Sequence, residues 1–432
     1  MSQPVLAENK DAFSKRPNHN LKPGHIECCQ ICGSKNLEVV LDLGHQPLCD
    51  SLLYKEDLQK PETFYPLRQV WCKDCTLNQI DYVVDGAVVY HQDYPYKSGV
   101  TKELVTYQNK MAEDIVTDLS IPQGSLIADI GSNDGTLLKG FKNQGMNVIG
   151  IEPTNIAEIA SQDGINTLHS PFNQKIAQEI VRNYGHAQVV TATNVFAHMA
   201  TLGDVMEGLE ILVDDAGYFC FENHYLGAIA DRMQYDTIYH EHLRSYSLHS
   251  LIKLFEYYDF TIVDAMKVSR YGGNIRVYAA KGKNHTPKAS VQKMLEDEIK
   301  VGMTTPEYYQ DFRERSVKLK NDFVSLLLRL RSEGYSVVGN SCPGRCSTLL
   351  NYAGIGPEIL PYLAEQPASL KLGRYLPGKH IPIINNEILL QEQPDYVVLL
   401  AWHYADSIIE QLRARGLKSK FIMPMPEVRI ID

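Results

Sequence analysis

Four cysteines near the start of the chain form two pairs whose spacing suits a metal ion. Cys29 and Cys32 enclose two residues, and so do Cys72 and Cys75. Each pair places two thiolates on one tight turn, and two such turns close a tetrahedral shell around Zn²⁺. All four positions are cysteine and leave no place for a catalytic water, so we predict a structural zinc ion. The stretch between the pairs is longer than in a minimal zinc ribbon, and four buried free cysteines are the alternative interpretation. Alternative ligands in this stretch are Cys28, His25 and His45.

A glycine-rich turn follows an apolar strand at residues 126–130 and precedes a helix. Its spacing, Asp-x-Gly-x-x-x-Gly, lacks the close glycine pair that packs a pyrophosphate in dinucleotide folds. The turn resembles motif I of class I S-adenosylmethionine (SAM) methyltransferases. Glu152 ends the next strand, where a carboxylate accepts hydrogen bonds from ribose hydroxyls. We therefore predict SAM as the cofactor, and the alternative is an ordinary glycine turn beside a solvated Glu152. The expected cofactor-binding residues are Asp129, Gly131, Ser132, Asn133, Gly135, Glu152 and Asn194.

Residues 235–246 hold titratable groups side by side with tyrosines. His240 and His242 do not share a helix face, and Arg244 stands where a zincin has its second histidine, so a helical metal site is disfavoured. An acid–base cluster fits better, because a histidine with a pKa near 6.5 takes up a proton near neutral pH and Glu241 can orient it. The alternative is a solvated polar loop. His198 follows the strand at residues 188–192, at the edge of the sheet where ligands bind, although a packed structural histidine is equally compatible.

The elements that must position these groups change in character along the chain. Short strands at 38–43 and 67–71 surround the cysteines, and a helix is predicted at 101–118. Strands alternating with helices then predict a mostly parallel sheet with helices on both faces. A helical region at 289–333, with a helix start at Thr305–Pro306, ends at Gly334, and a second α/β pattern follows. The strands expected in the two α/β regions lie at 126–130, 147–152, 188–192, 217–222, 335–339 and 395–400.

Composition excludes several classes of protein. The chain has 432 residues, of which 42 are Lys or Arg and 52 are Asp or Glu, and its net charge is −10. Binding to a nucleic-acid polymer needs a basic face that neutralises phosphates, so we expect no such partner. No apolar run approaches the roughly 18 residues of a membrane helix, and residues 1–20 lack the apolar core of a secretory leader. We expect a cytoplasmic protein, where a reducing environment opposes disulfides among its nine cysteines.

The order of these motifs resembles that of bacterial nucleotide-sugar C-methyltransferases, such as the C-3 methyltransferases of branched deoxysugar pathways. The matching motifs span roughly residues 25–430. They are the two CxxC pairs, DLGHQPL at 42–48, DYPYKS, DIGSNDG, ATNVFAH, YDTIYHEHLRSYS and GRYLPGKHIPI. The resemblance implies an α/β protein with a small N-terminal zinc-binding module, a central class I SAM methyltransferase domain with a Rossmann-like fold, and a C-terminal Rossmann-like domain that closes the sugar-nucleotide cleft. The expected boundaries are a disordered tail at 1–24, then domains at 25–85, 86–285 and 286–432.

The resemblance also implies the substrate and the reaction. The substrate is a nucleoside-diphosphate 4-keto-6-deoxy sugar, a histidine removes the proton at carbon 3, and the enolate carbon attacks the SAM methyl group. The family's Tyr-x-Glu-His run matches Tyr239, Glu241 and His242, so His242 is the implied base, while His198 and Tyr96 match two further active-site residues. A C–H bond beside a ketone is too weak an acid for histidine until hydrogen-bond donors stabilise the enolate. The candidate donors are Tyr96, Tyr239 and a protonated His198.

One loop departs from the family pattern. Residues 339–351 are longer than expected, and Arg345 stands where the family has a lysine. Because arginine binds phosphate through a planar fork, the identity of the nucleotide stays open. We expect Arg345, together with Tyr94 and Lys97, to bind the substrate, although the segment holding the last two also reads as a plain linker. Cys342 and Cys346 in this loop are interpreted as unpaired thiols, and a reactive pair is the alternative. The alternative functions are an O- or N-methyltransferase on a nucleotide sugar and a non-catalytic zinc- or SAM-binding protein.

Overall fold

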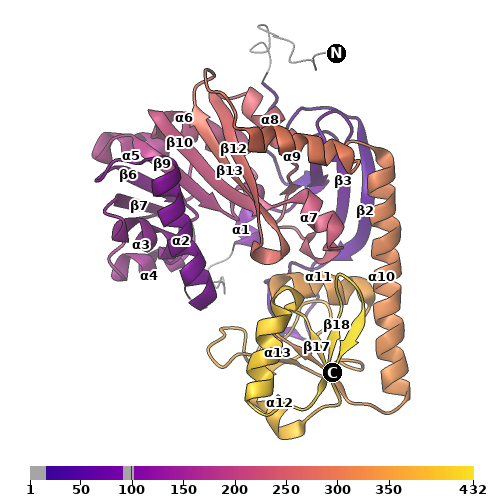
Figure 1. Ribbon diagram of the computed structural model, residues 1–432. Helices are drawn as coiled ribbons and strands as arrows, with labels where there is room; N and C mark the ends of the chain where they lie inside the picture. The colour runs from indigo at the N-terminus through magenta and orange to yellow at the C-terminus, as the bar shows by residue number, and fades with distance from the viewer. Residues whose placement is uncertain (1–15, 91–98, 100–101) are drawn as a thin grey trace.

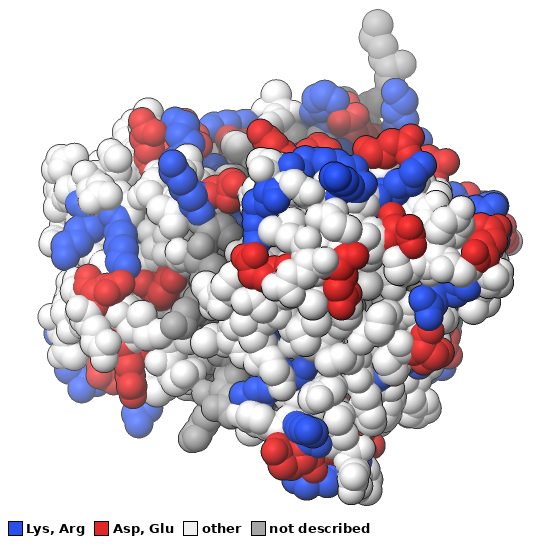
Figure 2. Space-filling view, turned by 90° about the horizontal axis from the view of Figure 1, so that it is seen from below, with Lys and Arg blue, Asp and Glu red and all other residues white. Residues whose placement is uncertain are grey.

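The computed structural model describes residues 16–90, 99 and 102–432. Three parts follow one another along the chain, each built on its own sheet (Figure 1). The four-stranded sheet of the N-terminal module lies beside the large central sheet, and the C-terminal sheet lies below both in that view. On the face shown in Figure 2, basic and acidic side chains are interspersed.

The N-terminal module is an antiparallel sheet whose fourth strand comes from the central domain. Its order is β11-β4-β3-β2. Trp71 at the end of β3 is 2% exposed and packs against Tyr309, with 4.6 Å between the ring centroids. The strand from the central domain, β11, is only two residues long. The strands are β2 (Leu37–Gln46), β3 (Tyr65–Cys72), β4 (Asn78–Ile80) and β11 (Arg244–Ser245), with β1 (Gly24–His25) and β5 (Tyr82–Val83) as a separate pair.

The central sheet has seven strands in the order β12-β13-β10-β9-β6-β7-β8. All are parallel except β13, which is antiparallel to both neighbours. The chain reverses its winding direction between β6 and β9, and ligands bind at such a switch point, outside the carboxyl ends of the strands. The strands are β6 (Leu126–Ile130), β7 (Asn147–Glu152), β8 (Thr167–His169), β9 (Ala187–Thr193), β10 (Val213–His224), β12 (Phe260–Val268) and β13 (Asn274–Lys281). The helices of this part are α1 (Gly86–Val89), α2 (Lys102–Asp118), α3 (Thr136–Asn143), α4 (Ile156–Gln162), α5 (Gln174–Tyr184), α6 (Leu202–Leu212), α7 (Leu226–Asp231) and α8 (Leu248–Glu256).

The C-terminal part has a second switch point. Its six strands are ordered β16-β15-β14-β17-β18-β19, and all but the last are parallel. The winding direction reverses between β14 and β17, so the loops after these two strands are the expected ligand edge. The strands are β14 (Val337–Asn340), β15 (Leu363–Glu365), β16 (Ile383–Asn385), β17 (Tyr396–Leu399), β18 (Lys420–Met423) and β19 (Arg429–Ile431), and the helices are α11 (Gly344–Ala353), α12 (Glu387–Glu392) and α13 (Ala405–Ala414).

One long helix connects the upper parts to the C-terminal part. α10 (Pro306–Ser332) has 27 residues, begins with proline in its first turn, and runs down one side of the molecule in Figure 1. Its buried residues recur at helical spacing, and this stripe faces the rest of the protein. They are Tyr309, Phe312, Ser316, Leu319, Phe323, Leu327 and Leu330. No helix in the described ranges combines the length and apolar character needed to cross a bilayer.

The sequence predicts a disordered tail through residue 24, but residues 16–21 contact the central domain and Gly24 pairs with Val83 in the strand pair β1–β5. Arg16 forms an ion pair with Glu207 at 3.1 Å. His19 is 2% exposed and its Nδ1 lies 2.6 Å from the Tyr258 hydroxyl oxygen, and burial lowers its pKa to about 4. These contacts are tertiary, so the polar composition of the segment gave no sign of them.

The predicted boundary at residue 286 places α9 (Ala289–Lys300) in the C-terminal domain, whereas α9 packs on β12 and α8 of the central part. Its Glu298 is 1% exposed and accepts hydrogen bonds from the Tyr225 hydroxyl at 3.0 Å and from the Leu248 N–H at 2.6 Å. A helical period does not show which neighbour a helix packs against. Here the contact is set by the buried Glu298 carboxylate of α9, which binds the first N–H group of α8.

Candidate active site

A cavity of about 820 Å³ lies where the three parts meet. Asp50 reaches it from the N-terminal module, residues 129–133 from the central sheet, and Arg345 and Tyr404 from the C-terminal part. Ligand sites span about 300–1,000 Å³, so a cavity near the upper end has room for a cofactor and an acceptor together. Both switch points open onto it.

The glycine-rich turn after β6 is shaped for close approach by a ligand. Gly131 has φ +68°, and a Cβ there would lie 2.6 Å from Cγ1 of Val195, so only glycine fits. Asp129 is 2% exposed, accepts a hydrogen bond from the Thr191 hydroxyl at 2.7 Å, and has its pKa raised to about 7 by burial. The Ser132 hydroxyl is buried and has no hydrogen-bond partner among the described residues, as expected of a group that binds a ligand.

The Glu152 carboxylate is held in place at the end of β7. Its two oxygens accept the N–H groups of Asn133 and Thr154, each at 2.9 Å. Oε1 also accepts the Thr154 hydroxyl at 2.6 Å, so Oε2 is the oxygen that keeps an acceptor site for a ribose hydroxyl. Asn194, which has φ +56°, accepts a hydrogen bond from the Asn274 amide at 2.9 Å at the same edge. The expected cofactor residues 131–133, 152 and 194 therefore line one cavity and fit SAM. Gly135 instead caps α3 with φ +75°.

The four predicted zinc ligands lie together at the edge of the N-terminal module. The sulfur of Cys29 is 3.4 Å from that of Cys75, and the sulfur of Cys32 is 3.5 Å from that of Cys72. Zn–S bonds of about 2.3 Å place tetrahedral sulfurs about 3.8 Å apart, so the cluster suits Zn²⁺ closely. Cys28 is outside this cluster. This geometry favours a zinc site over the alternative of four free thiols.

His242 lies at the centre of a group of rings that line the cavity. Its Nδ1 is 2.6 Å from the Thr237 carbonyl oxygen, which can only accept, so Nδ1 carries the proton and Nε2 keeps a lone pair in the neutral ring. The ring centroids of Tyr239, His224 and His198 lie 3.9, 4.8 and 4.9 Å from that of His242. Three imidazole rings and a phenol ring therefore lie side by side at the cavity wall.

Burial keeps these histidines neutral. It lowers the pKa of His198 to about 4 and that of His224 to about 3. The pKa of His242 also lies well below its usual value, because of burial first and of His224 and His198 next. The predicted protonated His198 is therefore wrong at neutral pH, and a neutral His198 donates through one N–H only.

The neighbouring members of the 235–246 run point in different directions. Glu241 is 5% exposed and accepts a hydrogen bond from the Cys49 thiol at 3.4 Å, so the zinc-binding module contacts it directly. Nε2 of His240 lies 3.2 Å from the Pro66 carbonyl oxygen, toward that module. The two histidines of the run thus occupy different environments, and His242 is the one surrounded by titratable groups.

Arg345 lies in the first turn of α11 and lines the cavity. Its Nη2 donates to Asp236 at 2.8 Å and to Gln234 at 2.9 Å, and Trp402 donates to the other oxygen of Asp236 at 2.9 Å. The guanidinium is thus partly committed to a buried ion pair between two domains. Its Nε is buried without a hydrogen-bond partner in the described part of the chain.

Some predicted residues cannot be placed, and others were missed. Tyr94, Tyr96 and Lys97 fall outside the described residues. His224 was missed although it ends β10, at the same edge of the sheet that drew attention to His198. Lys371, which pairs with Asp50 at 3.0 Å, carried no local signal. The assembled groups can remove a proton from a bound acceptor within reach of a SAM-type loop.

Comparisons with known proteins match all three parts of the chain. Models for a zinc binding domain, a methyltransferase domain and a C-methyltransferase C-terminal domain match residues 29–90, 105–265 and 269–426. C-methyltransferase NovU from Streptomyces niveus is 32% identical over 412 residues, which cover 94% of this chain and 97% of that protein. Among solved structures, magnesium protoporphyrin IX methyltransferase from Synechocystis PCC 6803 with bound SAM is 15% identical, covering 42% of this chain and 82% of that one, with a TM-score of 0.32. The PH0226 protein from Pyrococcus horikoshii OT3 is 10% identical, covering 43% and 94%, with a TM-score of 0.35.

Proposed function

Because this chain belongs to the family of SAM-dependent C-methyltransferases, we propose that it methylates carbon 3 of a nucleoside-diphosphate 4-keto-6-deoxy sugar. Membership of this family favours transfer to carbon over the O- or N-methyltransferase and non-catalytic alternatives. The sugar, its nucleotide and the carbon are our inference from the motif pattern and from the cavity.

The observation that carries the proposal is the hydrogen bond that fixes the tautomer of His242. With the Nδ1 proton held by the Thr237 carbonyl, Nε2 is the basic nitrogen, and the ring stays neutral at neutral pH. In this proposal His242 accepts the carbon-3 proton. SAM, when bound, supplies the electrophilic methyl group that the carbanion attacks.

A buried histidine with a lowered pKa is a weak base, so the acidity of the C–H bond must be raised by its surroundings. Tyr239 lies close enough to His242 to donate a hydrogen bond to the ketone oxygen of the same substrate, and a neutral His198 is the second donor. Burial raises the pKa of Tyr239 well above its usual value, so its hydroxyl stays protonated and available as a donor. We assign Tyr96 to the same set, and Glu241 to orienting the loop.

The diphosphate fits the C-terminal side of the cavity. Arg345 has an unpartnered Nε at the start of α11, a helix of ten residues whose first N–H groups favour an anion. Lys371 lies near, since its ammonium hydrogen-bonds to the Cys342 carbonyl oxygen at 2.9 Å. We assign phosphate binding to Arg345, with Tyr94 and Lys97 as further substrate-binding residues.

The test combines substrate identification with one variant. A panel of nucleotide 4-ketosugars is incubated with methyl-deuterated SAM, and products are analysed by mass spectrometry. We expect one sugar to gain a methyl group that fragments with the ring carbons and resists mild hydrolysis. Loss of the label as deuterated methanol on fragmentation would instead mean O-methylation, because a methyl ether leaves with its oxygen whereas a methyl group on carbon stays with the ring. No label on any sugar, with SAM binding intact, would place the acceptor outside this class.

The role of His242 is tested separately by exchange of the carbon-3 proton in D₂O. His242→Asn should bind SAM and the sugar but exchange at least about 100-fold more slowly, as expected for loss of a general base. His240→Asn is the comparison variant, because His240 also lines the cavity but its Nε2 lies 3.2 Å from the Pro66 carbonyl oxygen of the N-terminal module. Exchange at the wild-type rate in His242→Asn would remove His242 from the base role.

A further inference from the structure

Residues 19–23, here called the strap, run along one wall of the cavity between the central domain and the N-terminal module. Leu21 and Pro23 of the strap line that cavity. The Leu21 N–H donates to the Ala200 carbonyl at 2.9 Å, and the residue directly after the strap pairs with Val83 of β5. Ala200 and Val83 line the cavity as well, so both attachments of the strap lie on its wall.

Two polar side chains hold the first half of the strap. Oδ1 of Asn20 accepts the Asp204 N–H at 3.0 Å, in the first turn of α6. The first four N–H groups of a helix have no partner within the helix, so this bond stabilises α6 and the strap together. Nε2 of His19 lies 2.7 Å from the Ile31 carbonyl oxygen, which can only accept a hydrogen bond. In the neutral ring Nδ1 therefore accepts from the Tyr258 hydroxyl, 2.6 Å away.

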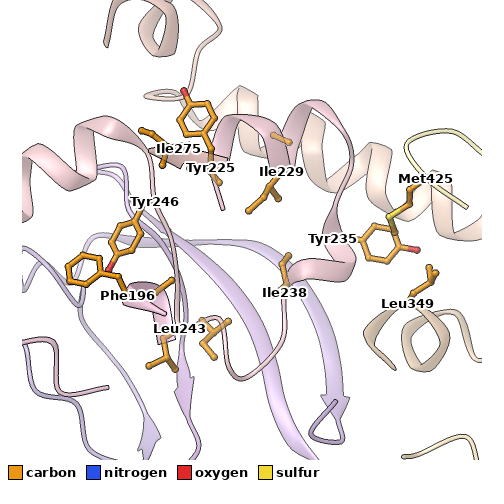
Figure 3. Packing of buried hydrophobic residues seen from close by; sticks show 14 of the residues in the cluster. Phe196, Tyr225, Ile229, Tyr235, Ile238, Leu243, Tyr246, Ile275, Leu349 and Met425 are labelled. Carbon is orange, nitrogen blue, oxygen red and sulfur yellow. The ribbon is translucent and has the colours of Figure 1, made fainter. Parts of the chain in front are cut away.

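The turn after β9, to which the strap is bonded, is itself fixed in the core. Phe196 of this turn is 0% exposed, and Figure 3 shows it packed beside Leu243 and Tyr246. The rings of Phe196 and Tyr246 stack with centroids 5.7 Å apart. The turn begins at Asn194, which is one of the expected cofactor residues and lines the cavity. The strap therefore rests on a fixed part of the cofactor side.

The strap extends an apolar wall on this side of the cavity. Phe172, after β8, and Val205, in the first turn of α6, line the cavity, and Leu21 lies beside that turn because the residue before it bonds to the same turn. Phe172 packs on α6 as well, since a Cβ at Gly208 would lie 3.0 Å from its Cε1. β8 is the neighbour of β7, which ends on Glu152. Adenine is attached directly to the ribose of SAM, so an apolar wall next to Glu152 suits that flat ring.

We propose that the strap is part of the SAM site, with Leu21 and Pro23 as the outer wall of the adenine pocket. His19 and Asn20 are positioning residues that hold this wall in place. An apolar wall there removes the ring from water and so strengthens binding of the cofactor. This role requires SAM as the cofactor but neither the sugar acceptor nor His242 as the base, so the strap and the proposed function can fail separately.

The first test measures the affinity of the full-length protein for S-adenosylhomocysteine, which has the same adenosine group as SAM, by calorimetry. Leu21→Ala should raise the dissociation constant at least about fivefold, because the half-buried side chain loses most of its apolar surface. Lys22→Ala is the matched control, because Lys22 is an exposed residue of the same strap, and it should leave the dissociation constant unchanged. Equal dissociation constants of these two variants would overturn the proposal.

The positioning role is tested with two variants of Asn20. Asn20→Ala removes the acceptor for the Asp204 N–H and should raise the same dissociation constant about fivefold. Asn20→Asp keeps an acceptor for that N–H, so its dissociation constant should stay within about twofold of the wild-type value. A loss of affinity in Asn20→Asp equal to that in Asn20→Ala would remove Asn20 from the positioning role.

Hydrogen exchange of the wild-type protein tests the strap without any substitution. The Leu21 N–H exchanges only when its bond to Ala200 opens. With S-adenosylhomocysteine at about 100 times its dissociation constant, opening that requires loss of this ligand becomes up to about 100-fold less frequent, so exchange in residues 19–24 should slow at least about tenfold. Exchange in α12, at the bottom of the C-terminal part in Figure 1, is the control and should not change. This measurement decides alone if Leu21→Ala does not fold, and unchanged exchange in the strap would overturn the proposal.

Discussion

The pH dependence of carbon-3 proton exchange follows from the surroundings of His242. Burial and the neighbouring His224 and His198 lower its pKa well below the usual value, so the neutral, basic ring persists to lower pH than in a free histidine. A base with a pKa of about 6.5 is only about one-eleventh neutral at pH 5.5, which would slow the reaction about tenfold relative to pH 7.5. Because the shift is downward, we expect kcat/KM for exchange to fall far less than tenfold over this range.

The assay is solvent deuterium exchange at subsaturating sugar, with SAM binding and zinc content measured at each pH as controls. Since kcat/KM reports the free enzyme, an acid limb with a midpoint near 6.5 would refute the assignment of a buried neutral His242 as the base. A flat profile in wild type, together with at least a 100-fold loss in His242→Asn across the whole range, would agree with it.

Two further predictions concern the contacts that shape the cavity. Asp236→Asn leaves the buried Arg345 guanidinium without its counter-ion, so the free energy of unfolding in urea should drop by about 3–5 kcal/mol, whereas Asp215→Asn, at a fully exposed carboxylate, should leave the midpoint unchanged. A smaller loss in Asp236→Asn would mean that the pair contributes little. Gly131→Ala introduces a methyl group with no room and should weaken SAM binding by about tenfold or more in calorimetry, while Gly164→Ala, which has similar φ but open space around it, should leave the affinity unchanged. Equal effects of the two glycine variants would contradict the tight fit of the turn.

Local patterns predicted the elements that form the cofactor side of the cavity. The strand expected at 126–130 is found with those bounds, and the strand expected at 147–152 likewise ends on Glu152. Apolar runs followed by a glycine turn specify such strands without help from the rest of the chain, because both faces of a parallel sheet are buried. The cysteine spacing likewise predicted the zinc site, because each ligand pair lies on one tight turn and its geometry is local.

The side of the cavity assigned to the methyl acceptor could not be predicted from local patterns, because residues far apart in the sequence form it. Asp50 and Lys371 are separated by more than three hundred residues and form an ion pair at 3.0 Å. Arg345 was expected to bind phosphate, but its Nη2 forms an ion pair with Asp236. Asp236 is 0% exposed, and in the sequence it stood out only as one member of a polar run. Nothing in the spacing of these residues indicates that they meet.

The segment at 234–246, which carries the proposed base, belongs to the central part and contacts both other parts. Its Gln234 and Asp236 bind Arg345 of the C-terminal part, and its Leu243 and Arg244 complete the zinc module's sheet. Between these two attachments the segment contains little regular structure, and the His242 ring is fixed locally by the Thr237 carbonyl oxygen, 2.6 Å from its Nδ1. A base of lowered pKa must be aligned closely with its proton to act at all, and tethering at both ends supplies that alignment. We therefore predict that a substitution at either attachment reduces proton exchange while the affinity for SAM persists.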